Sequence, residues 1–183
     1  GLLRKQSPEL TARLGSLLAR GGKLEEGLKL LEKVRARLGR DPGYLVHFGM
    51  ALMKAGREDD AEAVLTNALT LGGGNDARLM MAVLKGHRGH FEQADALAAT
   101  VEAAEEGPLL RGARAVRADC RLFLGDAPGP LALWKQMQHD AQLEPDQLGH
   151  MAYAAQIAGE PELADRLIPQ RLRQTPLAED RLL

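Results

Sequence analysis

The sequence has one cysteine, few aromatic residues and no long apolar run. Aromatic side chains make up 3% of the 183 residues, while hydrophobic residues make up 45%. A β-sandwich is usually rich in β-branched and aromatic residues, so this composition favours helices packed through Leu, Ala, Val and Met. Because Cys120 is the only cysteine, no internal disulfide can form, and the redox compartment stays open.

Nothing in the chain marks a membrane or a nucleic acid as its partner. No apolar run approaches the roughly 20 residues that span a bilayer, and no signal peptide is present. We therefore expect no direct membrane insertion, and both cytoplasm and periplasm remain open. A formal net charge of −1 gives no general reason to expect nucleic acid. Since the chain begins with Gly1 rather than Met, we expect it to be a piece of a longer protein.

What the chain does have is a repeat marked by glycine. The intervals between successive marker glycines are 34, 33, 36 and 34 residues, for Gly22, Gly56, Gly89, Gly125 and Gly159. Small residues lie seven positions before each marker and, except at Pro130, five positions after it. Small residues let two antiparallel helices cross closely, and glycine permits the tight turn between them. Acidic residues that follow most of the markers suit the positive end of a second helix.

Larger apolar residues fill the remaining positions of each unit at helical spacing. In three of the units the expected core residues are Leu14, Leu18, Leu28, Leu31 and Val34; Leu45, Phe48, Leu52, Leu65, Ala68 and Leu69; and Leu148, Met151, Ala155, Leu167 and Ile168.

This period, with two helices per unit and small residues at their crossing, resembles the tetratricopeptide repeat. The stretch from Leu45 to Gly72 matches best, and the resemblance covers roughly residues 8 to 176. It implies an all-α, right-handed superhelical solenoid of about five helical hairpins. We expect one repeat domain over 1–183, with units at about 8–41, 42–74, 75–108, 109–144 and 145–176.

The fourth unit departs from the pattern. Arg117 and Arg121 stand where core residues are expected, and an apolar set shifted by one position fits better: Leu110, Ala113, Val116, Cys120 and Phe123. Its second helix contains Trp134 and Met137 after a longer turn. In the fifth unit, Pro169 should kink or end the second helix, because proline removes a hydrogen-bond donor.

The resemblance implies a scaffold or adaptor, without catalysis or cofactor, that binds a protein or peptide in a groove lined by the first helix of each unit. In bacteria, related arrays serve envelope, pilus, secretion and motility assemblies. The register places ten residues in this groove or at its edge: Val46, His47, Met50, Met53, Leu79, Met80, Val83, Leu122, Tyr153 and Gln156. Methionine adapts to varied apolar partners, so we expect an amphipathic helix or apolar segment to dock there. The alternative is that these side chains pack against neighbouring helices.

Other chemistries have weak signals. His87 and His90 straddle a turn without further metal ligands, and Cys120 has no paired histidine, so it reads as a buried structural thiol. The Gly72–Asp76 stretch lacks the lysine and hydroxyl residue of a phosphate loop. The places that hold a carboxylate clamp in some relatives lack cationic and amide donors. An RNA-binding repeat needs a continuous basic groove, which the apolar middle argues against.

A basic stripe on the fourth unit leaves two readings open. Its members are Arg111, Arg114, Arg117 and Arg121. They could receive an acidic partner, or they could pair with Glu102, Glu105 and Glu106 just upstream, which we favour. Two alternatives to a protein-binding scaffold also stay open: end-to-end self-association through apolar termini that include Leu2 and Leu3, and an accessory domain of a larger enzyme or regulator.

Overall fold

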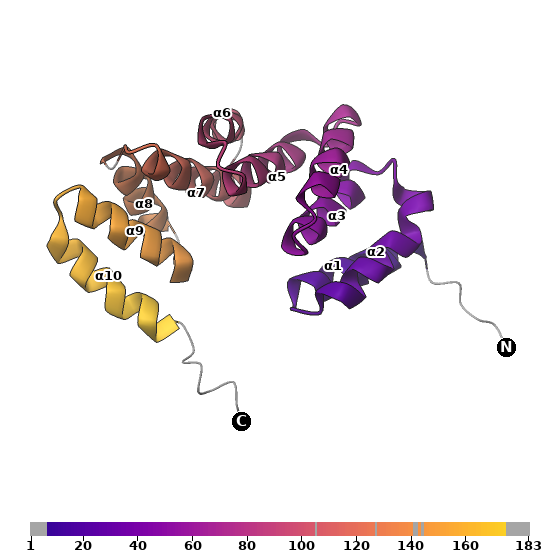
Figure 1. Cartoon of the computed structure of the whole chain (residues 1–183), viewed down its shortest axis with the longest axis horizontal. Helices are drawn as coiled ribbons and strands as arrows, with labels where there is room; N and C mark the ends of the chain where they lie inside the picture. Colours follow the sequence, from indigo (N-terminus) through magenta and orange to yellow (C-terminus); the bar gives the residue numbers. More distant parts are fainter. Residues whose placement is uncertain (1–6, 105, 127, 141–142, 144, 175–183) are drawn as a thin grey trace, which may run out of the picture. The chain divides into compact units, whose positions relative to one another are not determined.

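A computed structural model describes residues 7–104, 106–126, 128–140, 143 and 145–174. Within these residues the chain forms ten α-helices and no strand, which confirms the all-α expectation. The helices divide into two compact units, residues 1–87 and 88–183, each with its own internal packing (Figure 1). None of the described helices is both long and apolar enough to cross a membrane.

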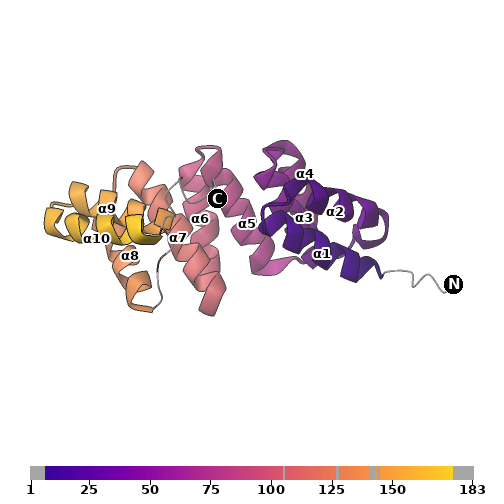
Figure 2. The same ribbon diagram turned by 90° about the horizontal axis from the view of Figure 1, so that it is seen from below.

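Unit 1 contains helices α1 to α5. Their bounds are Pro8–Arg20, Leu24–Leu38, Pro42–Lys54, Glu58–Thr70 and Gly74–His87. Helix α1 packs along α2 and α3 along α4, while α3 also contacts α1 and α5 (Figures 1 and 2). The first helices of successive hairpins therefore lie next to one another, as the repeat predicts.

The crossing of α1 and α2 depends on two facing glycines. A Cβ placed on Gly27 would lie 2.5 Å from the Gly15 carbonyl oxygen, and one on Gly15 would lie 2.9 Å from the Gly27 carbonyl oxygen. Real Cβ atoms do not approach backbone so closely, so the two backbones meet where neither residue has a side chain. In the next hairpin Leu65 fills the space beside Gly49.

Unit 2 contains helices α6 to α10. Their bounds are Phe91–Glu102, Gly107–Phe123, Pro128–Asp140, Pro145–Ile157 and Pro161–Gln174. Helix α6 packs along α7, and α9 packs along α10. The core around α7 to α10 is built on large side chains, with Trp134, Met151 and Leu167 almost completely buried. Trp134 and Met137, which the sequence placed in the second helix of the fourth unit, are both buried in this core.

The turns follow the glycine markers. Gly22, Gly56, Gly89, Gly125 and Gly159 all have positive φ, between 70° and 91°, which residues with a Cβ rarely adopt. Several first helices have side-chain caps: Ser7 accepts a hydrogen bond from the Leu10 amide, and Asp41 from the Tyr44 amide. Acidic residues occupy the first turns of α2, α4, α6 and α10, where they meet the positive end of the helix dipole.

Three residues expected in the core are exposed instead. The exposed fractions are 47% for Leu14, 66% for Phe123 and 49% for Ile168. Ile168 borders a hollow between α9 and α10, while Phe123 stacks on Phe91 with ring centroids 4.8 Å apart. The sequence predicted that Pro169 would kink or end its helix. The helix does not end there, because α10 continues to Gln174.

The third expected hairpin, over 75–108, straddles the division between the two units. Its first helix, α5, belongs to unit 1 and its second, α6, to unit 2. The proposed division of the chain into five sequence units within one domain therefore stays a prediction.

Candidate interaction surface

The expected groove residues fall into both units, seven in unit 1 and three in unit 2. Val46 and Leu79 are buried, with 7% and 5% of their surface exposed. His47 is exposed on α3. The remaining four members in unit 1 are half-buried: Met50, Met53, Met80 and Val83. Burial at Val46 and Leu79 shows that part of the predicted set supports helix packing, while the half-buried side chains present apolar surface.

A hollow of about 630 Å³ lies between the first helices α1 and α3. Ala12, Ser16 and Leu17 of α1 face Tyr44 and His47 of α3 across it. Tyr44 is held in place because its hydroxyl donates a 2.9 Å hydrogen bond to the Leu31 carbonyl oxygen, and burial raises the pKa of Tyr44 to about 12. The hollow therefore has a fixed aromatic and aliphatic wall.

A second, much smaller depression lies along the same two helices. It shares Ser16, Arg20 and His47 with the first and adds Met50 and Lys54. We call the two together the α1–α3 groove, whose lining residues used below are Ala12, Arg13, Ser16, Leu17, Arg20, Tyr44, His47, Met50 and Lys54. The sequence placed His47 and Met50 at this surface.

The cations of the α1–α3 groove have no ion-pair partner among the residues that the structure describes. Arg13, Arg20 and Lys54 are exposed and make no hydrogen bond or salt bridge within that part of the chain. Two carboxylates, Glu9 and Asp41, also line the hollow. Asp41 is engaged as the cap of α3, and hydrogen bonds from the Glu9 backbone and from Ser7 lower the pKa of Glu9.

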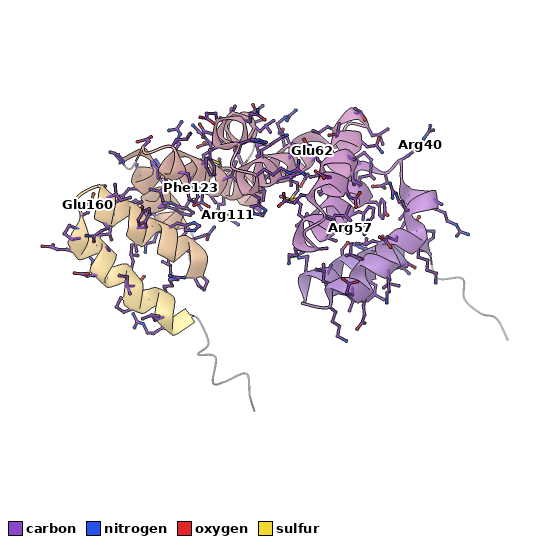
Figure 3. All side chains as sticks on the ribbon, in the orientation of Figure 1. Arg40, Arg57, Glu62, Arg111, Phe123 and Glu160 are labelled. Carbon is purple, nitrogen blue, oxygen red and sulfur yellow. The ribbon has the colours of Figure 1, made fainter. Side chains whose placement is uncertain are left out.

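A hollow of similar size on the other side of α3 is organised differently. It measures about 640 Å³ and lies among α2, α3 and α4. Here Arg57, which is labelled in Figure 3, pairs with Glu32 at 2.9 Å and with Asp60 at 2.8 Å. Arg35 stacks its guanidinium 5.7 Å from the ring centre of Phe48. These cations are therefore already engaged within unit 1, whereas those of the α1–α3 groove are available.

The near-zero charge of the chain conceals two oppositely charged units. Unit 1 has 14 Lys and Arg against 10 Asp and Glu, and unit 2 has 10 Lys and Arg against 15 Asp and Glu. The net charge alone could not reveal this, because the two excesses nearly cancel. A positive unit attracts acidic surfaces and speeds their association.

Three of the four arginines of the α7 stripe pair inside unit 2, whereas Arg111 is exposed and forms no ion pair among the described residues. Arg114 contacts Glu102 at 3.1 Å, and Arg117 contacts both Glu102 and Asp95. Arg121 reaches Asp95 at 3.4 Å. The intramolecular reading is thus confirmed for Glu102, while Glu105 lies outside the described residues. The sequence analysis missed Asp95, which stands more than twenty residues before its arginine partners.

Burial and pairing act in opposite directions on Glu102. Burial alone would raise its pKa, but hydrogen bonds from Arg117 and Arg114 outweigh that effect and hold the pKa below its ordinary value. Burial of Arg117 disfavours its positive charge and by itself would lower its pKa. Hydrogen bonds to Glu102 and Asp95 outweigh this effect, so the pKa of Arg117 is raised. Both shifts favour the charged forms of Glu102 and Arg117, and this ion pair links α6 to α7.

The remaining chemical candidates are placed by the structure as follows. Cys120 is buried, and burial raises the pKa of its thiol to about 11, so the thiol is poorly reactive. His87 and His90 are exposed. Within the described residues, no three His, Cys, Asp or Glu side chains gather as a metal site would require. His150 Nδ1 lies 2.7 Å from Asp119 Oδ1, which links α9 to α7.

The three groove residues expected in unit 2 lie on two helices. Leu122 is half-buried on α7, and Tyr153 and Gln156 are exposed on α9. Tyr153 and Gln156 line a hollow of about 330 Å³ between α9 and α10, together with Ile168 and Leu172. This hollow carries large apolar side chains, and Arg171, the cation in its lining, has other interactions.

Comparison with known proteins identifies the fold. No protein-family model matches the chain, and no curated protein matches it. Among solved structures, a thermophilic TPR protein of Thermus thermophilus has a TM-score of 0.77 at 18% identity, covering 95% of this chain and 94% of its own. A tetratricopeptide repeat protein of Parabacteroides merdae has a TM-score of 0.77 at 16% identity, covering 96% and 68%.

MamA from Desulfovibrio magneticus RS-1 is also similar, with a TM-score of 0.68 at 17% identity over 91% of this chain and 94% of its own. At such identities the likeness speaks to architecture and not to shared activity. Together with the helix pairs and the glycine-marked turns, these neighbours show that this chain has the tetratricopeptide-repeat fold.

Proposed function

We propose that this protein is a non-catalytic scaffold that binds a segment of another protein along the first helices of its repeats. The observation that carries the proposal is the α1–α3 groove, which joins a hollow of about 630 Å³ to the half-buried Met50. Protein surfaces that combine a pocket with methionine adapt to helical or extended segments. Met53, Met80 and Val83 extend the apolar surface onto α3 and α5.

The proposal assigns no catalysis to the chain. A nucleophile needs an activating base within hydrogen-bond reach, and Cys120 instead lies buried with a raised pKa. Binding is also what a superhelical repeat surface commonly provides.

The test is to select binding peptides from a phage-displayed random library and compare their affinity for two variants. Met50→Glu/Met53→Glu introduces charge on the apolar surface and should reduce binding at least about tenfold, because it leaves carboxylates desolvated against an apolar partner. Thr66→Glu/Asn67→Glu adds the same charge at exposed positions of α4 and should leave binding unchanged. If peptides bind all three proteins equally, the groove assignment is wrong.

Self-association is a second candidate, supported by apolar side chains exposed on the first and last helices. On α1 the exposed fractions are 62% for Leu10 and 65% for Leu17, and on α10 Leu172 is 62% exposed. Uncovered apolar repeat ends favour stacking of copies. Leu2 and Leu3, expected to take part, lie outside the described residues. Light scattering over a concentration series decides this candidate, since a strict monomer removes it.

A further inference from the structure

We infer that the α1–α3 groove selects an acidic segment of its partner, one that carries at least two carboxylates and an apolar side chain. This inference rests on the proposed function, because it names the chemistry of the segment bound there. It begins from Arg13, Arg20 and Lys54, which line the groove without an ion-pair partner among the described residues. Arginine and lysine side chains form strong charge-assisted hydrogen bonds with carboxylates.

The spacing of the cations sets the spacing of the partner's carboxylates. Arg13 and Arg20 are seven residues apart on α1, so they lie on one face about 10 Å apart along the helix. A helical partner would match them with acidic residues seven positions apart, and an extended partner with residues about three positions apart. Lys54, in the last turn of α3, would bind a carboxylate of the partner from the other helix of the groove.

The wall of the hollow supplies the apolar half of the recognition. Between the cations, the hollow is bounded by Ala12, Leu17 and the ring of Tyr44. An aliphatic or aromatic side chain from the partner would cover this surface and exclude water from the ion pairs around it. The attraction between opposite charges is stronger in ion pairs shielded from water in this way than in fully solvated ion pairs.

The contrast with the opposite side of α3 shows that these cations are not simply part of the fold. There, Arg57 forms ion pairs with Glu32 and Asp60. In the α1–α3 groove, Asp41 caps its own helix, and Glu9 is the other carboxylate in the lining. The groove therefore holds more positive than negative groups, within a unit that is itself positive. An acidic segment is complementary to both the local and the wider charge.

The experiment uses peptides selected on the unmodified protein from a random library fused to phage through the peptide C-terminus. Such display leaves no free terminal carboxylate, so any acidic preference must come from Asp or Glu side chains. Peptides whose binding depends on Met50 and Met53 are then synthesised with a fluorescent label and an amidated C-terminus. We expect them to contain two or more acidic residues and to bind more weakly as salt rises.

Charge variants locate the acidic contacts. Arg13→Glu/Arg20→Glu/Lys54→Glu should weaken these peptides about tenfold or more. The neutral set Arg13→Gln/Arg20→Gln/Lys54→Gln should weaken them less. The control Lys29→Glu/Lys33→Glu/Arg40→Glu makes the same change of charge at exposed positions of unit 1 that do not line the groove, and it should retain most of the affinity. Circular dichroism checks that every variant is folded.

Several results would overturn the inference while leaving the proposed function intact. Selected peptides could depend on Met50 and Met53 and yet be neutral or basic, or could bind the charge-reversed protein as well as the unmodified one. A single-stranded oligothymidylate that competes more strongly than the peptides would show a preference for nucleic acid. Salt-sensitive dimers lost on charge reversal would make a second copy the occupant. If no peptide depends on Met50 and Met53, the proposed function itself fails.

Discussion

The two units solve the same packing problem with different side chains. Unit 1 brings α1 and α2 together at Gly15 and Gly27, where backbone meets backbone. Unit 2 fills its core with Trp134, which is fully buried. The units also differ in their cations: α7 arginines are paired with Glu102 and Asp95, while those of the α1–α3 groove are left available. A shared repeat thus fixes where helices turn, without fixing which charges remain free for a partner.

Among substitutions that test this difference between the units, the largest loss of stability is expected at Trp134. Trp134→Ala should lower the free energy of unfolding of unit 2 by about 3–5 kcal/mol, because a large buried side chain is replaced by a cavity. Hydrogen exchange of the α7 to α9 amides measures the loss directly.

A matched control lies next to it in the sequence. Lys135 is exposed and pairs with Glu160 at 2.7 Å, so Lys135→Ala should cost less than about 1 kcal/mol. Equal effects of the two changes would show that Trp134 is not the centre of the unit 2 core.

A smaller effect is expected at the glycine crossing of unit 1. Gly27→Ala places a Cβ against the Gly15 carbonyl and the Ala19 backbone, and should destabilise the α1–α2 hairpin by about 1–3 kcal/mol. Amide exchange of α1 and α2 is the measurement. Gly43→Ala, at an exposed position near the start of α3 where a Cβ would meet only the Asp41 side chain at 3.2 Å, should change the stability by less than about 1 kcal/mol. A neutral Gly27→Ala would refute the close approach.

The smallest of the three effects concerns the arginine cluster of unit 2. Glu102→Gln removes the charged partner of Arg114 and Arg117 and should cost about 1–2 kcal/mol at pH 7, since the group keeps some exposure. Chemical denaturation followed by Trp134 fluorescence measures it, because the chain has a single tryptophan. Glu106→Gln, at an exposed position, serves as the control and should change little.

The contribution of Glu102 to the free energy of unfolding should decrease at acidic pH. The pKa of Glu102 is lowered in the folded protein, so the unfolded chain takes up this proton first as pH falls. The stability that Glu102 contributes is therefore complete above the ordinary glutamate pKa of about 4.3 and is lost as pH falls through the lowered value. Glu102→Gln should reduce this loss of stability at acidic pH.

Much of the fold could be predicted from the sequence because glycine and small residues act locally. A positive φ at Gly22 or a crossing at Gly15 needs no knowledge of distant partners. Exposure was harder to predict: Leu14 and Ile168 belong to the first and last hairpins, where one flank has no neighbouring helix among the described residues. The prediction that Phe123 is buried was wrong for another reason. Its ring stacks on Phe91 of the neighbouring helix α6, a contact that the spacing within its own helix does not reveal.

The site was predicted less well than the fold. His47 and Met50 line a depression on α1 and α3, and their part in binding stays a prediction, whereas Val46 and Leu79 are buried. The cations of the α1–α3 groove that are unpaired among the described residues were missed because pairing depends on which carboxylates come near in the fold, and an arginine of this chain can pair with a carboxylate 26 positions away, as Arg121 does with Asp95. The signal that could have revealed them is the seven-residue spacing of Arg13 and Arg20 on one helix face.

The buried state of Cys120 has a practical use. Its thiol is the only one in the chain, is shielded within α7 and has a pKa raised to about 11. A maleimide dye at neutral pH would therefore attach to a cysteine engineered on the surface long before it reached the native one. The protein can thus carry a single spectroscopic probe at a chosen position without first being stripped of its own sulfhydryl.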